Sequence, residues 1–215
     1  MALLPGVGAD DVRVPVDVTQ APWRAVGRVQ TELGARCTGF LVGPRTVMTA
    51  AHCLYRAGPA RFVQPRSVHF LLGYRMGRYA AHARAVAFTV GPGWDPARKM
   101  QTLGADWAAL TLDAPLGTAD RVLGVARSAP VAGTPAMLGG YGKDRAELID
   151  ADLHCAVLGQ GRDADGRPLI THACAGTSGT SGAPLLVKED AGWVAAGIQV
   201  AVEEDRARGI AVPMP

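Results

Sequence analysis

The chain has 215 residues, 48% of them hydrophobic and 19% charged, with a formal net charge of +3 at pH 7. This composition is typical of a globular protein long enough for one large or two small cores. No apolar run approaches the ~18–20 residues that a membrane-spanning helix needs, so we expect no membrane span. The basic residues are scattered, without a run or a basic-aromatic stripe, so we expect a solvated surface and no nucleic-acid partner.

The composition favours an all-β protein with tight turns, because 27 glycines and 15 prolines are more than a helical chain of this length usually contains. Residues 1–13 are expected to form an irregular N-terminal arm. Short apolar runs then alternate with turns and predict a first series of strands at 25–30, 37–42, 46–49, 68–72, 83–90 and 108–112. We expect a short helical turn over 49–54, where small residues dominate, and a long Pro-containing loop over 91–104.

A second series of strands is predicted at 135–139, 148–158, 169–173, 183–187, 193–200 and 209–212. The segment 113–128 contains Pro115, Gly117 and Gly124 and is expected to link the two series. About six strands in each half predict two small antiparallel barrels, over 14–116 and 117–215, with any site in the cleft between them.

Two segments carry residue types that serve nucleophilic catalysis. His52 lies in Thr-Ala-Ala-His-Cys at 49–53, and Ser181 lies in Gly-Thr-Ser-Gly-Ala-Pro at 179–184. A serine hydroxyl becomes a useful nucleophile when a histidine accepts its proton and a buried carboxylate holds that histidine in the right tautomer. The glycines beside Ser181 let the backbone curl so that N–H groups point at one spot, where an oxyanion can be stabilised.

Asp106 is the first candidate for the carboxylate, because it opens an apolar strand and can be shielded from water there. Asp95 is the alternative, but it lies in the Pro-containing loop, where we expect it to be solvated. Ser178 is the alternative nucleophile, although it lacks the Gly-x-Pro continuation that follows Ser181. Each residue alone has an ordinary structural explanation, and the joint case rests on all three occurring in order on one all-β pattern.

A zinc site is the competing interpretation of the second half of the chain. His154, Cys155, His172 and Cys174 together offer two histidines and two cysteines, a composition that zinc accepts. The spacing lacks a Cys-x-x-Cys pair, and adjacent residues of a strand point to opposite faces. We therefore expect no metal site and no cofactor.

The chain resembles the chymotrypsin-fold serine endopeptidases, and within them the bacterial trypsin-like and glutamyl-endopeptidase-like branch. The matching segments are 49–53 for the base, 106–110 for the acid, 179–185 for the nucleophile, 196–200 for a pocket wall and 22–27 for the first strand. The resemblance runs from about residue 14 to residue 212. It implies two six-stranded antiparallel Greek-key β-barrels, with an active site in the cleft between them.

The resemblance also implies an activity. His52, Asp106 and Ser181 would form a triad that hydrolyses peptide bonds of a protein or peptide substrate through an acyl-enzyme. The backbone N–H groups of Gly179 and Ser181 would form the oxyanion hole. The substrate pocket would be lined by Ala175, Gln199, Val200, Ala201 and Val202.

Three departures from the family bear on activation and specificity. Thr180 stands where animal trypsins carry an aspartate that pairs with a freshly cut N-terminal ammonium, so we expect activity without a buried N-terminal ammonium. Ala175 replaces the aspartate of Arg/Lys-cleaving enzymes, and Gln199 replaces a histidine of many glutamate-cleaving relatives. We therefore expect neither simple trypsin specificity nor a strict preference for glutamate. The acidic group after the pocket strand offers a preference for a basic substrate residue, with a solvated hairpin as the simpler interpretation: Glu203, Glu204 and Asp205.

The family further implies two disulfides, Cys37 to Cys53 and Cys155 to Cys174. Two disulfides indicate an oxidising compartment, so we expect a secreted or periplasmic protein whose signal peptide has been removed. We expect a monomer. Two alternatives to an endopeptidase remain, namely a catalytically silent protease-like protein that acts as a binding module and an esterase that uses the same triad.

Overall fold

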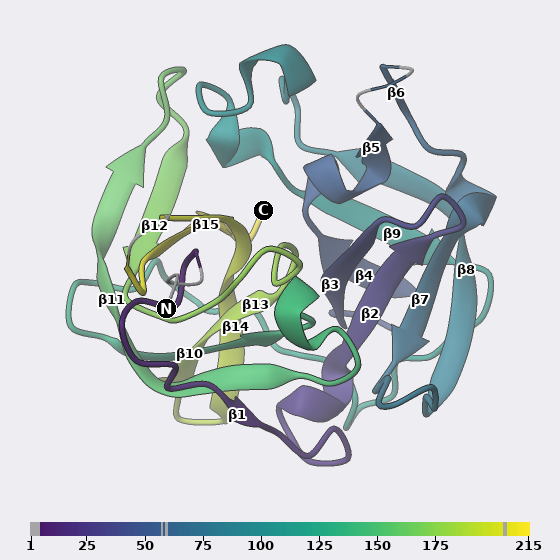
Figure 1. Ribbon diagram of the computed structural model, residues 1–215, viewed down its shortest axis with the longest axis horizontal. Helices are drawn as coiled ribbons and strands as arrows, with labels where there is room; N and C mark the ends of the chain where they lie inside the picture. Colours follow the sequence, from purple (N-terminus) through teal and green to yellow (C-terminus); the bar gives the residue numbers. More distant parts are fainter. Residues whose placement is uncertain (1–4, 57, 59, 204–205) are drawn as a thin grey trace.

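The computed structural model describes residues 5–56, 58, 60–203 and 206–215. Two β-barrels lie side by side (Figure 1). The first closes in the order β2-β3-β4-β9-β8-β7, with every neighbouring pair antiparallel. Its strands are β2 (Val26–Thr31), β3 (Arg36–Leu41), β4 (Thr46–Thr49), β7 (Val68–Leu72), β8 (Ala81–Val90) and β9 (Ala108–Leu112).

The second barrel has the order β11-β10-β13-β14-β15-β12 and is closed by pairing of β12 with β11. Its strands are β10 (Pro135–Gly140), β11 (Asp150–Arg162), β12 (Pro168–His172), β13 (Pro184–Glu189), β14 (Gly192–Val202) and β15 (Gly209–Pro213). Numbered within each barrel, both rings read 1-2-3-6-5-4. The prediction of an all-β fold with two six-stranded antiparallel barrels is confirmed.

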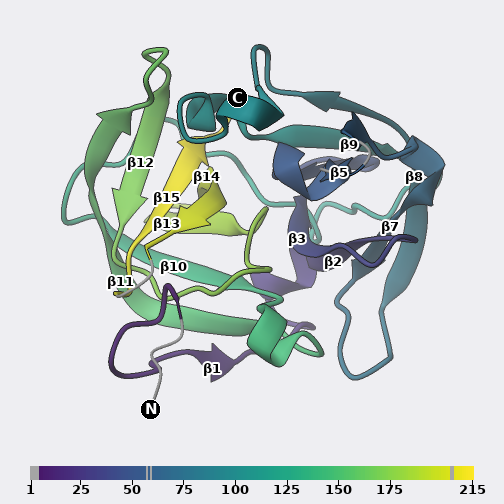
Figure 2. The ribbon, with the colours of Figure 1, turned by 45° about the horizontal axis from the view of Figure 1, so that its top comes forward.

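The strand β1 (Val14–Pro15) differs from the sequence-based division of the chain. It pairs with β11, Val14 opposite Ala151 and Pro15 opposite Asp150, so it belongs to the edge of the second barrel (Figure 2). Residues 14–15 were expected to open the first barrel. The chain instead starts on the second barrel and crosses to the first at β2, which places the N-terminal arm against the second barrel.

Short elements connect the strands. The strands β5 (Tyr55–Arg56) and β6 (Arg61–Phe62) form a small separate sheet. The helices are single 3-10 turns, among which η2 is the helical turn predicted over 49–54: η1 (Trp23–Ala25), η2 (Ala51–Leu54), η3 (Pro65–Ser67), η4 (Pro96–Arg98), η5 (Leu103–Ala105) and η6 (Lys143–Arg145). Within the described ranges, no helix has the length and apolar character to cross a membrane.

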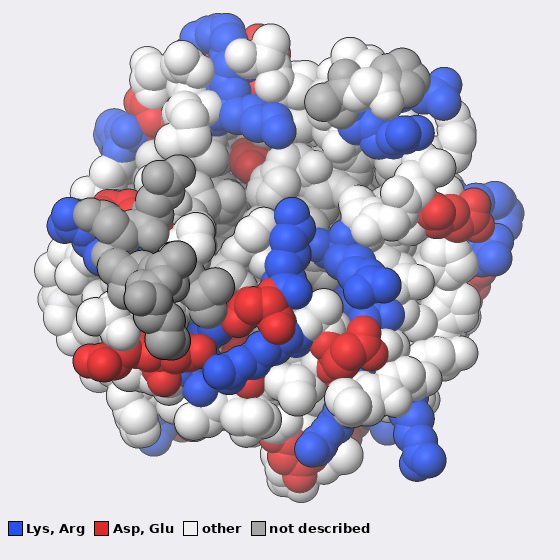
Figure 3. Space-filling view, in the orientation of Figure 1, with Lys and Arg blue, Asp and Glu red and all other residues white. Residues whose placement is uncertain are grey.

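Buried side chains of both barrels form the core. Phe40, Phe70 and Leu110 are fully buried on strands of the first barrel, and Leu138 and Leu185 on strands of the second. Burying an aliphatic or aromatic side chain of this kind contributes about 1.5–3 kcal/mol relative to leaving it exposed. On the surface, basic and acidic side chains are interspersed across the face drawn in Figure 3, in keeping with scattered charges in the sequence.

Candidate active site

His52 and Asp106 are brought together by the pairing of two strands in the first barrel. His52 lies in η2, three residues after β4, and Asp106 lies two residues before β9. Because β4 and β9 pair with Thr49 opposite Ala108, two residues that are 54 positions apart meet at one barrel edge. The register of a buried sheet therefore fixes this contact.

The carboxylate of Asp106 accepts two hydrogen bonds from the same histidine. His52 Nδ1 lies 2.6 Å from Asp106 Oδ2, and the backbone N–H of His52 donates to Oδ1 over 2.8 Å. Asp106 is 2% exposed, so the pair is shielded from water on the carboxylate side. A carboxylate at Nδ1 favours the tautomer that carries its hydrogen there, which leaves Nε2 free to accept a proton.

Asp95, the alternative carboxylate, has a structural position instead. Its Oδ1 accepts the backbone N–H of Ala97 over 2.9 Å, and Asp95 thereby caps the 3-10 helix η4. This is the ordinary use of aspartate at a helix N-terminus, where free N–H groups need an acceptor. The geometry therefore assigns the two aspartates different environments, one beside His52 and one in the loop.

Ser181 lies in the turn before β13, where the two barrels meet. Its carbonyl oxygen accepts the N–H of Thr38 in β3 over 2.9 Å, and Cys53 Sγ lies 3.9 Å from the same oxygen. Among the described residues, no hydrogen bond joins Ser181 Oγ to His52. Hydrogen bonds of this kind are often long in a free protein and tighten when a ligand binds. Ser178, the alternative nucleophile, is exposed at the rim of the same loop.

Two backbone N–H groups beside Ser181 have no acceptor in the described part of the chain, those of Gly179 and Ser181 itself. The carbonyl of Ser178 accepts the N–H of Lys143 over 2.6 Å. Because C=O and N–H of a trans peptide point in opposite directions, this contact turns the Gly179 N–H away from Lys143. Gly179 has φ +100°, and a Cβ there would lie 2.4 Å from Tyr141 O, so the conformation requires glycine.

A pocket of about 180 Å³ opens beside Ser181. Larger hollows lie elsewhere on the surface, such as one of about 370 Å³ that is lined by Phe62 and Arg84, but Ser181 does not line it. The described side chains that line the Ser181 pocket are all uncharged: Thr177, Ser178, Ser181, Gln199, Val200, Ala201 and Val202.

Ala175, which was also expected to line the substrate pocket, is not among the residues that line this hollow. It is 1% exposed, and its backbone N–H donates to Asp152 Oδ2 over 3.0 Å. The other four predicted lining residues, which lie on β14, are in the pocket wall.

His172 supports the pocket residue Gln199 from the buried side, a contact that sequence reasoning missed. It is fully buried, and its Nε2 lies 2.6 Å from Gln199 Oε1, while its Nδ1 accepts the N–H of Cys174 over 3.2 Å. Burial lowers the pKa of His172 to about 4, so the ring is neutral at pH 7. Gln199 Nε2 also donates to Ala201 O over 2.7 Å, which leaves one amide hydrogen for the pocket.

A glycine within a strand is the signal that could have revealed this contact. Gly209 in β15 lies between the strands that carry His172 and Gln199. A Cβ at Gly209 would lie 2.5 Å from His172 Cε1 and 2.8 Å from Gln199 Nε2. A glycine in a strand often marks a close approach of this kind.

Both predicted disulfides are present, Cys37–Cys53 and Cys155–Cys174. The first ties β3 to η2 beside His52, and the second ties β11 to the segment that leads to Ser181. The sulfur atoms of Cys155 and Cys174 are bonded to each other, and His172 Nε2 is hydrogen-bonded to Gln199, so three of the four residues of the zinc interpretation have other partners. The cluster of Cys37, His52 and Cys53 likewise contains a disulfide in place of thiolates.

The two closed barrels define a chymotrypsin-like fold. A solved structure of a Glu endopeptidase in complex with MPD matches 96% of this chain and 93% of its own, with a TM-score of 0.79 and 19% sequence identity. At this identity the likeness shows the fold. The family model described as Trypsin matches residues 13–215, and the chain therefore belongs to the trypsin family.

Sequence comparison adds a curated relative, a glutamyl endopeptidase from Bacillus licheniformis. It is 26% identical over 140 residues. These residues make up 65% of this chain and 42% of the relative, so the match spans less than half of the relative's length.

Proposed function

We propose that the protein is a serine endopeptidase in which His52, Asp106 and Ser181 form the catalytic triad. The observation that carries the proposal is the buried Asp106 carboxylate, which accepts two hydrogen bonds from His52. Membership of the trypsin family supports it. The free N–H groups of Gly179 and Ser181 beside the pocket add the remaining requirement, a site for a developing oxyanion.

The reaction would begin with attack of Ser181 Oγ on a peptide carbonyl, while His52 Nε2 accepts the hydroxyl proton. Asp106 orients the ring and stabilises the imidazolium that forms. The N–H groups of Gly179 and Ser181 bind the oxyanion of the tetrahedral intermediate. His52 then donates its proton to the leaving amine, and water hydrolyses the acyl-enzyme by the same steps in reverse.

The pocket would select an uncharged substrate side chain. Among the described residues no charged group lines it, and the remaining amide hydrogen of Gln199 can donate to a neutral oxygen acceptor. Glu203, one of the acidic residues that offered a basic preference, pairs with Arg206 over 3.2 Å and with Arg208 over 3.3 Å. Its charge is compensated, which favours the solvated hairpin; Glu204 and Asp205 lie outside the described residues.

The two disulfides support a secreted or periplasmic location, because they persist in oxidising compartments. The alternative function is a silent protease-like protein that binds peptides without cleaving them. It is favoured by one observation, the lack of a hydrogen bond between Ser181 Oγ and His52 across the part of the chain that the structure describes.

Labelling with a fluorophosphonate probe separates these functions, because the probe reacts with an activated serine and not with a resting hydroxyl. We expect the folded, disulfide-intact wild type and Ser178→Ala to be labelled and Ser181→Ala to stay unlabelled. A wild type that folds, retains both disulfides and takes up no probe would favour the binding protein. Labelling that Ser178→Ala abolishes would move the nucleophile to Ser178.

A further inference from the structure

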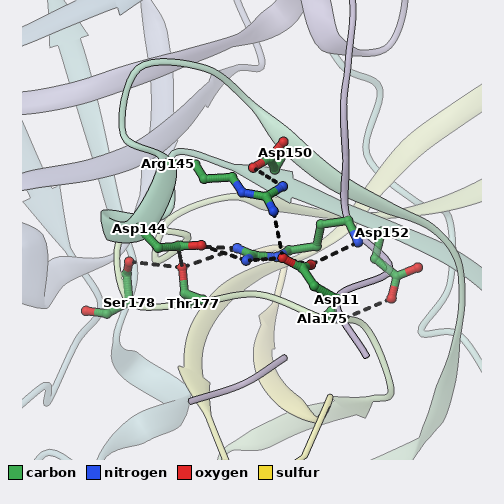
Figure 4. A network of polar contacts seen from close by, with 9 residues as sticks. Asp11, Asp144, Arg145, Asp150, Asp152, Ala175, Thr177 and Ser178 are labelled. Carbon is green, nitrogen blue, oxygen red and sulfur yellow. Dashed lines mark hydrogen bonds and ion pairs between the residues drawn. The ribbon is translucent and has the colours of Figure 1, made fainter. Parts of the chain in front are cut away.

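Residue 180 brings no carboxylate to the loop 175–181, so another feature must hold this loop in place. Thr180 itself donates its N–H to Thr177 O over 3.0 Å, a contact within the loop. Outside the loop, the described part of the N-terminal arm, residues 5–13, lies against it (Figure 4). The N-terminal amine lies outside the described residues, so the expectation that it is not needed stays a prediction.

Arg13 is a charged residue of the arm whose side chain is buried, only 2% exposed. Its Nη2 lies 2.7 Å from Asp144 Oδ2, its Nη1 lies 3.4 Å from Thr177 Oγ1, and its Nε lies 2.9 Å from Asp11 Oδ1. The planar guanidinium thus holds one carboxylate on each side and touches the loop before Ser181.

Two further contacts connect Asp144 to the oxyanion-hole peptide. Thr177 Oγ1 donates to Asp144 Oδ1 over 2.5 Å. The neighbouring residue Lys143 donates its N–H to Ser178 O over 2.6 Å. The 3-10 helix η6 is therefore attached to residues 177 and 178 at two successive points. The second of these contacts sets the direction of the Gly179 N–H.

The arm also holds the loop one residue earlier. Gly176 donates its N–H to Gly6 O over 2.9 Å, and the adjacent Val7 is buried. The arm thus contacts residues 176 and 177, which come directly before the peptide that bears the oxyanion donor. The loop and the arm are 170 positions apart for the pair of Gly6 and Gly176, so this support comes from tertiary structure alone.

Hydrogen bonds favour the charged forms of both Arg13 and Asp144. Burial alone would raise the pKa of Asp144, but hydrogen bonds from Arg13 and Thr177 hold it below its usual value. Burial alone would lower the pKa of Arg13, but hydrogen bonds to Asp11 and Asp144 outweigh this effect and raise the pKa above its ordinary value. The ion pair is therefore present at neutral pH.

We infer that Arg13 is a positioning residue for the oxyanion hole, and that it supplies from within the chain the positive charge that holds the loop 175–181. This rests on the proposed function. Arg13 anchors Asp144, Asp144 anchors Thr177, and the adjoining contact from Lys143 fixes the peptide between Ser178 and Gly179. When the guanidinium is lost, the Gly179 N–H loses its fixed direction while the pair of His52 and Asp106 is untouched.

The test compares Arg13→Met with Arg145→Met. Arg145 belongs to the same network, with Asp11 at 3.0 Å and Asp150 at 3.1 Å, but it forms no described contact with residues 175–181. Active sites are first counted by fluorophosphonate labelling to completion, and kcat per labelled site is then measured with a peptide substrate. We expect Arg13→Met to lower kcat by about 10²-fold, as loss of one oxyanion donor does, with KM within about threefold. Arg145→Met should stay within about threefold in both.

A merely structural role would reduce the labelled fraction and leave kcat per labelled site unchanged, and that result would overturn the inference. Arg13→Lys keeps the charge but not the fork, so it should recover part of the lost kcat. If Arg13→Met fails to fold, Asp144→Asn takes its place with the same expected loss.

Amide hydrogen exchange over 175–181 tests the same inference without turnover. Exchange in these peptides should rise at least tenfold in Arg13→Met and stay at the wild-type rate in Arg145→Met. Unchanged exchange in Arg13→Met overturns the inference. A wild type that neither labels nor cleaves overturns the proposed function instead, and the two failures are therefore distinguishable.

Discussion

The two halves of the candidate site are held in different ways. His52 and Asp106 lie at one edge of the first barrel, where the pairing of β4 with β9 fixes their contact. The loop of Gly179 and Ser181 lies outside the strands of the second barrel. It is held by the N-terminal arm, by η6 and by Thr38 of β3, which donates to the carbonyl oxygens of Gly179 and Ser181. The base and its carboxylate therefore depend on sheet register, whereas the oxyanion donors depend on contacts that a single substitution can remove.

The largest expected effect concerns the first half. Asp106→Asn should lower kcat by about 10⁴-fold with little change in KM, because an amide stabilises the wrong tautomer of His52 and cannot stabilise its charged form. Steady-state kinetics with a peptide substrate measures this effect. Asp95→Asn is the matched control, since Asp95 caps η4, and it should stay within about threefold. Equal losses in both variants would contradict the assignment of Asp106.

The next effect concerns the second half. Gly179→Ala places a Cβ 2.4 Å from Tyr141 O at φ +100°, so the peptide that carries the donor must move. We expect kcat to fall by about 10²–10³-fold. Gly34→Ala is matched in conformation, with φ +91° and no atom within 4 Å of its Cβ. It should show backbone strain in thermal unfolding but unchanged kcat. A Gly179→Ala variant with wild-type kcat would show that this N–H is not a donor.

The smallest effect concerns the pH dependence of the unfolding free energy, through the buried His172 behind Gln199. The pKa of His172 is lowered to about 4 from an ordinary value of 6.5, so at pH values between these the unfolded chain binds a proton that the folded chain does not. This contribution to the unfolding free energy is fully present above pH 6.5 and is lost as pH falls towards 4. At about 1.4 kcal/mol per unit, the loss amounts to roughly 3 kcal/mol.

Denaturant unfolding of wild type and His172→Gln at a series of pH values measures this term. The glutamine has no titrating group, so the slope between pH 6.5 and 4 should become shallower in the variant. Parallel pH profiles would mean that His172 does not carry the effect. The contact of His172 with Gln199 lies between β12 and β14. The result therefore tests a part of the second barrel that depends on strand register, as the pair of His52 and Asp106 does in the first.

Short-range sequence patterns were sufficient to predict most of the strands and the candidate site residues. Alternating apolar runs predicted the twelve barrel strands, and the segments around His52, Asp106 and Ser181 predicted the candidate site. The strands differ from prediction mainly at their ends, as in β11, which continues to Arg162. There, the more exposed residues alternate with glycines at 159 and 161 in a hairpin that extends beyond the barrel (Figure 1).

Contacts between distant segments could not be predicted. Nothing in the arm sequence indicates that Arg13 reaches Asp144 and Thr177, because that contact depends on where β1 joins β11. The contact of His172 with Gln199 likewise requires the register of β15 between their strands. The surroundings of Ala175 depend on a distant contact in the same way, since its N–H donates to Asp152 in β11.

The central claim is that Ser181 attacks a carbonyl and becomes acylated. The most direct measurement is rapid mixing with an activated peptide ester, followed by an acid quench and mass spectrometry of the digested protein. The account predicts a burst of about one equivalent of released alcohol, with the acyl group on the peptide that contains Ser181. If turnover occurs without a burst, the location of the trapped acyl group decides whether Ser181 is the nucleophile. An acyl group on any residue other than Ser181 would contradict acylation of Ser181.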